Sequence, residues 1–423
     1  DASVVSNLGY IVTADGTTSN PERETKSYYE ISSAAELKAY RDGWNSGAIT
    51  INKVKLTADI DISGENWYPI GNWEYPFYGT FDGNGKTLGG LYANSIDADH
   101  KGLYANNSVV GSGETFGFFG IVGNGDVTVK NLTFSNVNIN IYDGKNVGTV
   151  IGYAPKNEGF KNAKYTTKWQ ENEKIGTDKV ILSDITVSGN VMGKNHIAGI
   201  IGKNYSTGGL TLTNCTNNAT IASTYDTCSG LVGYSGYSDI TFISCTNNGN
   251  VINTNGRASG LLCNTPSGKT VTFTECKNTG SITGTTYVGG FLGYSNSKTI
   301  LYFNYCNNSG NITGKYAGGF WGGTDNGDTK VCFTGTAVNS GIITGNEYAS
   351  NFIGKNLGCD WNSGESIGDS VTPESAKSCI KHDGVTFTVI ENMENLHTNG
   401  NGKIAKYWTI GSTKNIQVNS LNG

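Results

Sequence analysis

The sequence predicts an all-β protein built as a right-handed single-stranded parallel β-helix, a solenoid closed at its N-terminal end by a helix. Three observations support this prediction. A short motif recurs at a regular interval, the segments after each copy alternate apolar and polar residues, and the composition favours strands and tight corners. The 423 residues include 60 Gly and 23 Tyr but only 6 Pro and 2 Met. Glycine suits corners that need positive φ, and tyrosine suits pleated, half-buried surfaces.

The recurring motif is Gly-apolar-apolar-Gly. Its full copies are Gly117-Phe-Phe-Gly120, Gly199-Ile-Ile-Gly202, Gly230-Leu-Val-Gly233, Gly290-Phe-Leu-Gly293 and Gly319-Phe-Trp-Gly322, and degenerate copies are Thr149-Val-Ile-Gly152, Gly260-Leu-Leu-Cys263 and Asn351-Phe-Ile-Gly354. Successive copies start 29 to 32 residues apart, except for one interval of 50 that contains a polar insertion at about 155–179. A period of this length is typical of a solenoid in which each repeat forms one coil.

Two further strand patterns follow each motif. Segments such as Ile240-Thr-Phe-Ile-Ser-Cys245 and Val271-Thr-Phe-Thr-Glu-Cys276 alternate apolar and polar residues, the period of a half-buried strand. A third short strand is expected six residues after the cysteine position, at Ile221, Val251, Ile282, Ile312 and Ile343. Each coil of about 30 residues is therefore predicted to hold about three short strands and three corners.

Stacking the coils aligns two columns of residues. The first, expected to face inward, contains Leu132, Ile185, Cys215, Cys245, Cys276, Cys306 and Ala337. Because Leu, Ile and Ala replace Cys there, we interpret these cysteines as buried apolar residues, while a disulfide between adjacent coils stays open. The second column contains Asn217, Asn247, Asn278, Asn308 and Asn339. Stacked asparagine amides can hydrogen-bond along the axis, so we expect a structural corner.

The ends of the array are expected to differ from its coils. The segment Ser33-Ala-Ala-Glu36 fits a capping box, and Leu37, Tyr40 and Trp44 share one face of the helix that follows. Such a helix would cover the exposed edge of the first coil. The predicted organisation is an irregular segment at 1–28, an N-terminal cap and entry region at 29–85, the β-helix at 86–357, and a C-terminal cap or small β module at 358–423.

The motif resembles the GLUG repeat of bacterial surface proteins. The segments Ile31-Ser-Ser-Ala-Ala-Glu-Leu37, Leu56-Thr-Ala-Asp-Ile-Asp-Ile62 and Phe77-Tyr-Gly-Thr-Phe-Asp-Gly-Asn-Gly85 resemble the entry region that such proteins share, so the resemblance covers about residues 30–355. It implies a secreted or surface-anchored β-helical protein with an adhesive role, located outside the cell. It transfers no functional residues, because the motif residues are structural. No leader-like segment opens the sequence, so we expect that any secretion signal has been removed or lies outside this sequence.

Composition and motifs exclude several function classes. The net charge is −5 and no basic block is present, which makes nucleic acid a poor partner. No apolar stretch approaches the ~18 residues of a membrane span, so no transmembrane segment is expected. None of the nine cysteines has the spacing of a metal site, and we expect no metal and no cofactor. Asp82-Gly-Asn-Gly85 resembles part of a calcium loop without its closing acidic residue, and a type I′ hairpin turn explains it instead.

Enzymes with this fold that act on polysaccharides need several carboxylates, or a carboxylate with a cation, on neighbouring coils. The aligned outward positions hold mostly Thr, Ser, Asn, Gly and Tyr, and the four His are scattered. We therefore predict no catalytic residues and a non-catalytic protein. A polysaccharide lyase or hydrolase and a passive structural stalk stay open as alternatives.

A tyrosine column is the candidate ligand-binding surface. Three residues before the motif, consecutive coils carry Tyr287, Tyr316 and Tyr348, and the same column holds His196, Thr227 and Arg257 in earlier coils. Stacked coils would set the three rings side by side as an exposed strip available to a glycan or a host surface protein. The alternative is that the rings only shield the strands. We expect the protein to act as a monomer.

Overall fold

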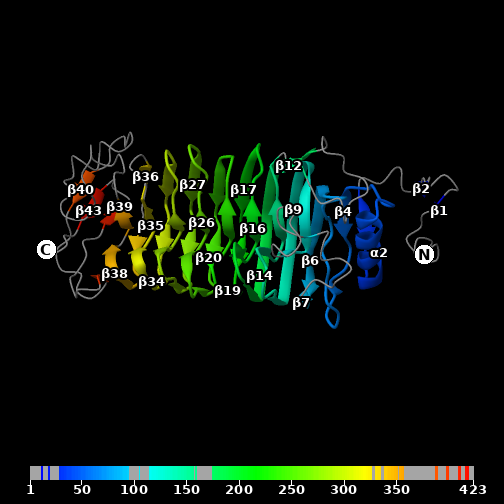
Figure 1. The fold of residues 1–423 in the computed structure, drawn as a ribbon, viewed down its shortest axis with the longest axis horizontal. Helices are drawn as coiled ribbons and strands as arrows, with labels where there is room; N and C mark the ends of the chain where they lie inside the picture. Colours follow the sequence, from blue (N-terminus) through cyan, green and yellow to red (C-terminus); the bar gives the residue numbers. More distant parts are fainter. Residues whose placement is uncertain are drawn as a thin grey trace.

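The computed structural model describes residues 28–94, 104, 114–156, 176–325, 329–334, 338–350 and 352–356, together with short strand segments elsewhere. Its strands join into one sheet of 36 members whose pairs are parallel, wound around a single core into an elongated solenoid (Figure 1). The predicted parallel β-helix is confirmed.

The first coils contain strands β3 to β14. Their bounds are β3 (Tyr29–Ile31), β4 (Lys53–Leu56), β5 (Ile60–Asp61), β6 (Phe77–Gly89), β7 (Tyr92–Ala93), β8 (Thr115–Phe116), β9 (Phe119–Asn140), β10 (Asn146–Gly148), β11 (Ile151–Ala154) and β14 (Thr177–Gly193). Two of them are long for a solenoid, because β9 has 22 residues and β14 has 17. These strands curve around more than one side of the coil.

The following coils are divided more finely than the predicted three strands. One coil contains β20 (Asp226–Ser229) and β21 (Val232–Ser235) on either side of the motif, then β22 (Ile240–Ile243), β23 (Thr246–Asn247) and β24 (Val251–Asn253). The coil before it contains β15 (Ile197–Ala198), β16 (Ile201–Asn204), β17 (Gly209–Thr213), β18 (Thr216–Asn217) and β19 (Thr220–Ser223). The motif is therefore a bend between two strands.

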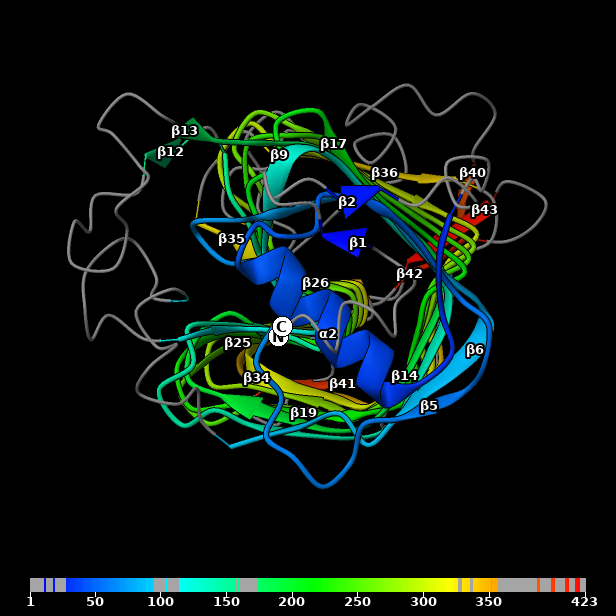
Figure 2. The same cartoon turned by 90° about the vertical axis from the view of Figure 1, so that its right-hand side faces the viewer.

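The later coils repeat this order. Their strands are β25 (Gly256–Ser259), β26 (Leu262–Asn264), β27 (Thr270–Thr274), β28 (Lys277–Asn278), β29 (Ile282–Thr283), β30 (Tyr287–Gly289), β31 (Leu292–Tyr294), β32 (Ile300–Asn304), β33 (Asn307–Asn308), β34 (Ile312–Gly318), β35 (Trp321–Thr324), β36 (Lys330–Thr334), β37 (Val338–Asn339), β38 (Ile343–Ser350) and β39 (Ile353–Asn356). Seen from the N-terminal end, β34, β35 and β36 follow one another clockwise as the chain recedes, which makes the coil right-handed (Figure 2).

Short strands outside these coils are β1 (Ile11–Val12), β2 (Thr18–Ser19), β12 (Glu158–Gly159), β13 (Lys174–Ile175), β40 (Thr386–Thr388), β41 (His397–Asn399), β42 (Trp408–Ile410) and β43 (Asn415–Val418). β41 pairs with β38 in parallel, and β40, β42 and β43 form a separate three-stranded sheet. The rest of the predicted C-terminal module and most of the predicted insertion lie outside the described residues.

The core consists of inward columns that continue from coil to coil. The rings of Phe242, Phe273 and Phe303 stack with centroids 5.0 and 5.1 Å apart. The cysteine column is also buried, and Cys215, Cys245, Cys276 and Cys306 carry free thiols, as the apolar interpretation predicted. Each thiol donates to carbonyl groups, as in the contact of 3.3 Å from Cys245 Sγ to Leu212 O. Ala337, the last predicted member, lies outside the described residues.

The predicted cap is helix α2 (Ala34–Asn45), which lies across the first coil (Figure 2). Ser33 Oγ accepts from Glu36 N at 3.3 Å, and the Glu36 carboxylate accepts from Ser32 N at 2.7 Å. Leu37, Tyr40 and Trp44 are buried against the coil as their spacing predicted. This helix therefore covers the edge at which further strands could otherwise add.

Candidate binding surface

The glycine motif bends the chain toward the core, and several of its glycines lie against another backbone. A Cβ at Gly230 would lie 2.2 Å from both Asn247 Oδ1 and Gly260 O, and a Cβ at Gly322 would lie 2.5 Å from Val288 N. Real Cβ atoms do not approach so closely, so side chains are excluded at both motif positions. The motif and the asparagine column, which the sequence offered as separate features, are thus packed against each other.

This bend creates a concave corner, which we call the inner corner. Val288 and Leu292, on either side of one bend, point into the core, whereas Tyr287 and Tyr294 point away from it. The outward rings of Tyr287 and Tyr294 still meet, with centroids 4.9 Å apart. Outward side chains of two successive strands converge only if the surface is concave between them. The inner corner runs along the solenoid axis, since every coil with the motif contributes to it.

Two columns of side chains line the inner corner. The strands before the motif contribute Asn146, His196, Thr227, Arg257, Tyr287, Tyr316 and Tyr348. The strands after the motif contribute Tyr153, Lys203, Tyr234, Asn264, Tyr294, Gly323 and Lys355. The first of these columns is the one that the sequence spacing located.

The tyrosine column forms in the predicted register but is not the exposed strip that we expected. Tyr287 pairs with Tyr316, and Tyr316 pairs with Tyr348. The rings of Tyr287 and Tyr316 lie 4.8 Å apart, yet these residues are only 6% and 9% exposed. The expectation of exposure was wrong because Tyr294 and Lys355 cover them from the other side of the corner. The side chain of Tyr348 lies outside the described residues.

A charged group closes this C-terminal part of the corner. Lys355 Nζ lies 2.6 Å from Asp325 Oδ1 and donates to Tyr287 Oη at 3.2 Å. The same ammonium lies 4.5 Å from the centre of the Tyr316 ring. Burial, followed by the hydrogen bond with Asp325, raises the pKa of Tyr287, so its hydroxyl stays protonated at neutral pH. The cluster is well satisfied internally, as a structural contact would be.

The N-terminal part of the corner is built around Lys203 and His196. The Lys203 ammonium lies 4.3 Å from the centre of the Tyr205 ring and 5.1 Å from that of Tyr153. His196 Nδ1 lies 2.8 Å from Thr227 Oγ1, and its ring centre is 4.9 Å from that of Tyr234. Burial and then the positive charge of Lys203 hold the pKa of His196 well below its usual range. The imidazole is therefore neutral at pH 7.

Beside the N-terminal cluster the corner opens toward solvent. Tyr205 and Tyr234 are half-buried, Tyr237 is 44% exposed, and Lys156 Nζ lies 4.0 Å from the centre of the Tyr237 ring. The ring centres of Tyr205 and Tyr237 are 4.8 Å apart. We call the group formed by Lys156, Tyr205, Asp226, Tyr234, Tyr237 and Arg257 the open stretch.

Arg257 and Asp226 form the polar side of the open stretch. The guanidinium carbon lies 4.2 Å from the centre of the Tyr294 ring, and Arg257 Nη1 lies 3.8 Å from Asp226 Oδ1. Both side chains are about one third exposed, at 30% and 32%. Burial raises the pKa of Asp226, and Arg257 opposes that shift.

Among the members of the open stretch that sequence reasoning missed, two are aromatic. Tyr205 and Tyr237 lie in loops that follow β16 and β21, outside the aligned columns. The only signal in the sequence is an aromatic residue in an otherwise polar loop, which does not distinguish a binding residue from a packing one. Their approach depends on the concave bend, which the motif spacing did not predict.

The segment around Asp82 differs from its predicted hairpin. It belongs to the continuous strand β6, which pairs in parallel with β9 and carries a register shift between Asp82 and Lys86. Asn84 and Gly85 have φ of 54° and 73°, so the turn-like sequence produces a bulge instead. Asp82 Oδ1 accepts from Asn84 N at 2.8 Å and Asn131 Nδ2 at 3.0 Å, so these donors occupy the carboxylate oxygen that a cation would need.

Within the described ranges, no group of three or more His, Cys, Asp or Glu side chains is arranged to hold a metal ion. Across the same part of the chain, no helix has the length and apolar character required to cross a membrane.

The fold and the inner corner define a parallel β-helical solenoid protein. No family model matches the chain, so the resemblance to the GLUG repeat stays an interpretation of the motif. The chain is 29% identical over 207 residues to Halomucin of Haloquadratum walsbyi, a match that spans 46% of this chain and 2% of that protein. It is 26% identical over 196 residues to a "Putative Gly-rich membrane protein" of Evansella cellulosilytica, spanning 45% of this chain and 21% of that protein.

A solved structure is also similar. It is described as a "putative immunoglobulin A1 protease" from Bacteroides ovatus, with a TM-score of 0.42 and 18% identity over 66% of this chain and 76% of that chain. This likeness carries no information about activity. The chain spans less than a quarter of either sequence relative's length.

Proposed function

We propose that this protein is a non-catalytic secreted or cell-surface protein that binds a glycan at the open stretch of the inner corner. One observation carries the proposal: the partly exposed rings of Tyr205, Tyr234 and Tyr237 lie together, with the ammonium groups of Lys156 and Lys203 against them. Aromatic rings offer flat apolar faces on which the C–H face of a sugar can stack, and adjacent polar groups pair with its hydroxyls. A concave surface along a solenoid axis suits a linear chain.

The location outside the cell is part of the same proposal. The name of one relative describes a membrane protein, which supports a surface location for this chain. The resemblance to the GLUG repeat of bacterial surface proteins supports it independently.

Tyr287, Tyr316 and Tyr348 belong to the proposed surface as its C-terminal continuation. Because Tyr287 and Tyr316 expose little area, we expect them to contribute less to binding than Tyr234 and Tyr237. Their larger role is to hold the corner closed through Lys355.

A polysaccharide-acting enzyme is the second candidate, and Asp226 is the observation that favours it. A carboxyl whose pKa is raised by burial is a suitable general acid. Its charged or titratable neighbours are His196 at 3.8 Å and Arg257 at 3.8 Å, rather than the second carboxylate that glycoside hydrolysis ordinarily requires. We therefore favour a glycan-binding protein over an enzyme.

A glycan array with the full chain tests the proposal, and the double variant Tyr234→Ala/Tyr237→Ala identifies the surface. We expect at least one glycan to bind, and we expect the double variant to weaken that binding at least about tenfold, roughly 1.4 kcal/mol. Tyr316→Ala should reduce binding less. The matched control is Tyr305→Asn, which removes a 57% exposed ring at the bend between β32 and β33.

Asparagine is chosen for this control because Tyr305 has φ of 53°, and Asn214 adopts φ of 52° at the corresponding corner. Full binding by the double variant would reject the open stretch as the site. Cleavage of any glycan would favour the enzyme, and an array without binding would favour a passive stalk.

A further inference from the structure

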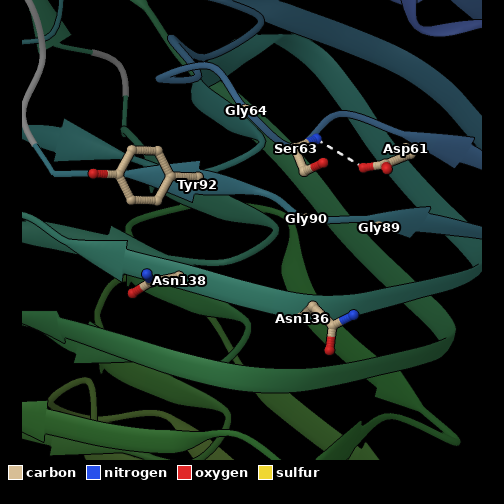
Figure 3. Close-up of a pocket in the computed structure, with 8 residues that line it drawn as sticks. All are labelled: Asp61, Ser63, Gly64, Gly89, Gly90, Tyr92, Asn136 and Asn138. Atoms are coloured by element: carbon tan, nitrogen blue, oxygen red, sulfur yellow. Dashed lines mark hydrogen bonds between the residues drawn. The ribbon is translucent and has the colours of Figure 1, made fainter.

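A separate hollow lies on the N-terminal coils, away from the inner corner. It has a volume of about 560 Å³ and draws its lining from three successive turns of the chain, namely Asp61, Ser63, Gly64, Gly89, Gly90, Tyr92, Asn136 and Asn138 (Figure 3). Asp61 is in register with Gly89, and Tyr92 is in register with Asn138. The volume is within the range of small-molecule binding sites.

The hollow exists because glycines occupy its floor. Gly64 and Gly90 have φ of 86° and 73°, which other residues rarely adopt. A Cβ at Gly90 would also lie 2.5 Å from Ser63 Cβ, so a side chain is excluded there, whereas Gly64 faces open space. In the next coil the position of Gly89 is held by Ser135, which has a side chain. The depression is therefore fixed by backbone conformation.

The walls combine one aromatic ring with unpaired polar groups. Tyr92 is half-buried, and Figure 3 places its ring on one side of the hollow, with Asp61 and Ser63 on the other. The amides of Asn136 and Asn138 are exposed and make no side-chain hydrogen bond to the described part of the chain. Asp61 Oδ1 accepts from Ser63 N at 2.8 Å, and this backbone hydrogen bond lowers the pKa of Asp61. The carboxylate is ionised at neutral pH.

We propose that this hollow is a second binding site, which takes one neutral sugar residue. The ring of Tyr92 would contact the apolar face of the sugar, while Asn136, Asn138 and Asp61 pair with its hydroxyls. A neutral ligand is indicated because none of the eight lining residues is cationic and one is a carboxylate. An anionic sugar would meet a like charge. The proposal does not depend on the open stretch, which is lined by other residues.

The proposal is tested by titrating the full chain with glucose, galactose, mannose and N-acetylglucosamine. Binding is measured by NMR or calorimetry. We expect one of them to bind with Kd of about 1 mM, about −4 kcal/mol. Tyr92→Ala should weaken that binding at least about tenfold, and Asn138→Ala should weaken it severalfold. Asn190→Ala is the matched control, because Asn190 is the exposed in-register neighbour of Asn138 one coil further on and does not line the hollow.

Gly64→Asn provides a variant that fills the site without removing a contact. Asparagine tolerates positive φ, and no atom lies within 4 Å of the Cβ position, so folding should be unaffected while sugar binding is lost. The Tyr234→Ala/Tyr237→Ala variant should keep this binding, which separates the hollow from the open stretch. The proposal is overturned if no sugar binds, if Tyr92→Ala and Gly64→Asn bind normally, or if glucuronate binds more tightly than glucose.

Discussion

The N-terminal and central coils form the same corner with different types of residue. In the first coils, the corner position is occupied by Leu88, Phe134 and Val187, which pair in register and are fully buried. From Asn217 onward the same position holds asparagine, since Val187 pairs with Asn217. The backbone differs accordingly. β9 and β14 run unbroken through the apolar corner, whereas each later coil divides into short strands around the asparagine.

This difference shows what a buried amide does that an apolar side chain cannot. Asn247 Nδ2 donates to Gly249 O at 2.9 Å and to Asn278 Oδ1 at 2.8 Å, while its Oδ1 accepts from Asn217 Nδ2 at 2.8 Å. The amide therefore satisfies a carbonyl of the tight turn that would otherwise lack a partner. Apolar corners cannot do this, and the β9–β14 pair passes its apolar corner with a register shift between Val187 and Gly189.

The two corners also differ in what they require of the glycine motif. Where the column has asparagine, the facing motif position is glycine, as in Gly199 beside Asn217 and Gly230 beside Asn247. In the coil where the column has Val187, the position equivalent to Gly199 is Thr149. Asparagine therefore requires glycine at the facing motif position, whereas an apolar corner accepts either residue, since Gly117 belongs to the coil of Phe134.

Gly230→Ala is expected to produce the largest loss of stability. The added Cβ would meet Asn247 Oδ1 and Gly260 O, and a backbone carbonyl cannot move aside without disturbing the next coil. We expect a loss of about 3 kcal/mol, read as a lower midpoint of guanidinium unfolding. Thr149→Ala is the control, because it removes a buried hydroxyl without a hydrogen-bond partner and should not lower the midpoint. Equal midpoints for Gly230→Ala and wild type would contradict this requirement for glycine.

Asn247→Ala tests the interior of the ladder. The substitution removes the side-chain partner of Gly249 O, of Asn278 Oδ1 and of one amide N–H of Asn217 inside the core. An unpaired buried polar group is costly, and we expect a loss of about 2 kcal/mol in unfolding free energy. Asn248→Ala removes the neighbouring exposed amide and its bond of 2.8 Å to Asn218, and should cost less than about 0.5 kcal/mol. A similar cost for both variants would reject the ladder as a stabilising element.

Asn217→Val moves the boundary between the two corner types by one coil. Val187 already occupies the preceding position, so valine would extend the apolar corner. It would remove the side-chain partner of Asn247 Oδ1 and of the Ala219 backbone, but it would disturb one neighbouring ladder amide instead of two. We expect a loss of about 1 kcal/mol, smaller than for Asn247→Ala. If both variants lose the same stability, the position of an asparagine within the ladder does not matter.

Much of this architecture could be predicted from the sequence. The interval of the glycine motif predicted the coil, and the columns of Cys245 and Asn247 were both located correctly, because side chains in register must share an environment. The direction of the bend at Gly230 could not be predicted, since spacing specifies where a corner occurs but not whether it is convex. For that reason Tyr287 was expected to be exposed, and the loop residues Tyr205 and Tyr237 were missed.

The residues that line the inner corner change along the solenoid axis. A substitution of His196 tests this change, and we expect it to have the smallest effect. Polar residues line its N-terminal end at Asn146 and His196, and Tyr287 and Tyr316 line its C-terminal end. Lys145, Lys203 and Arg257 surround the imidazole with positive charge, and Asp226 lies 3.8 Å away. Burial, reinforced by these cations, keeps His196 neutral in the folded state.

The pH dependence follows from this low pKa. Above pH 6.5, the usual pKa of histidine, the imidazole is neutral in both states and does not affect stability. As the pH falls below that value, the imidazole is protonated in the unfolded chain but not in the folded chain. The free energy of unfolding therefore declines. His196→Asn introduces the residue type that Asn146 supplies at this position one coil earlier. The variant should lack this part of the decline in stability. We expect the unfolding midpoints of the two proteins to agree at pH 7.5 and to diverge at pH 5.5. Parallel midpoints across that range would show that the inner corner accepts a charged imidazole.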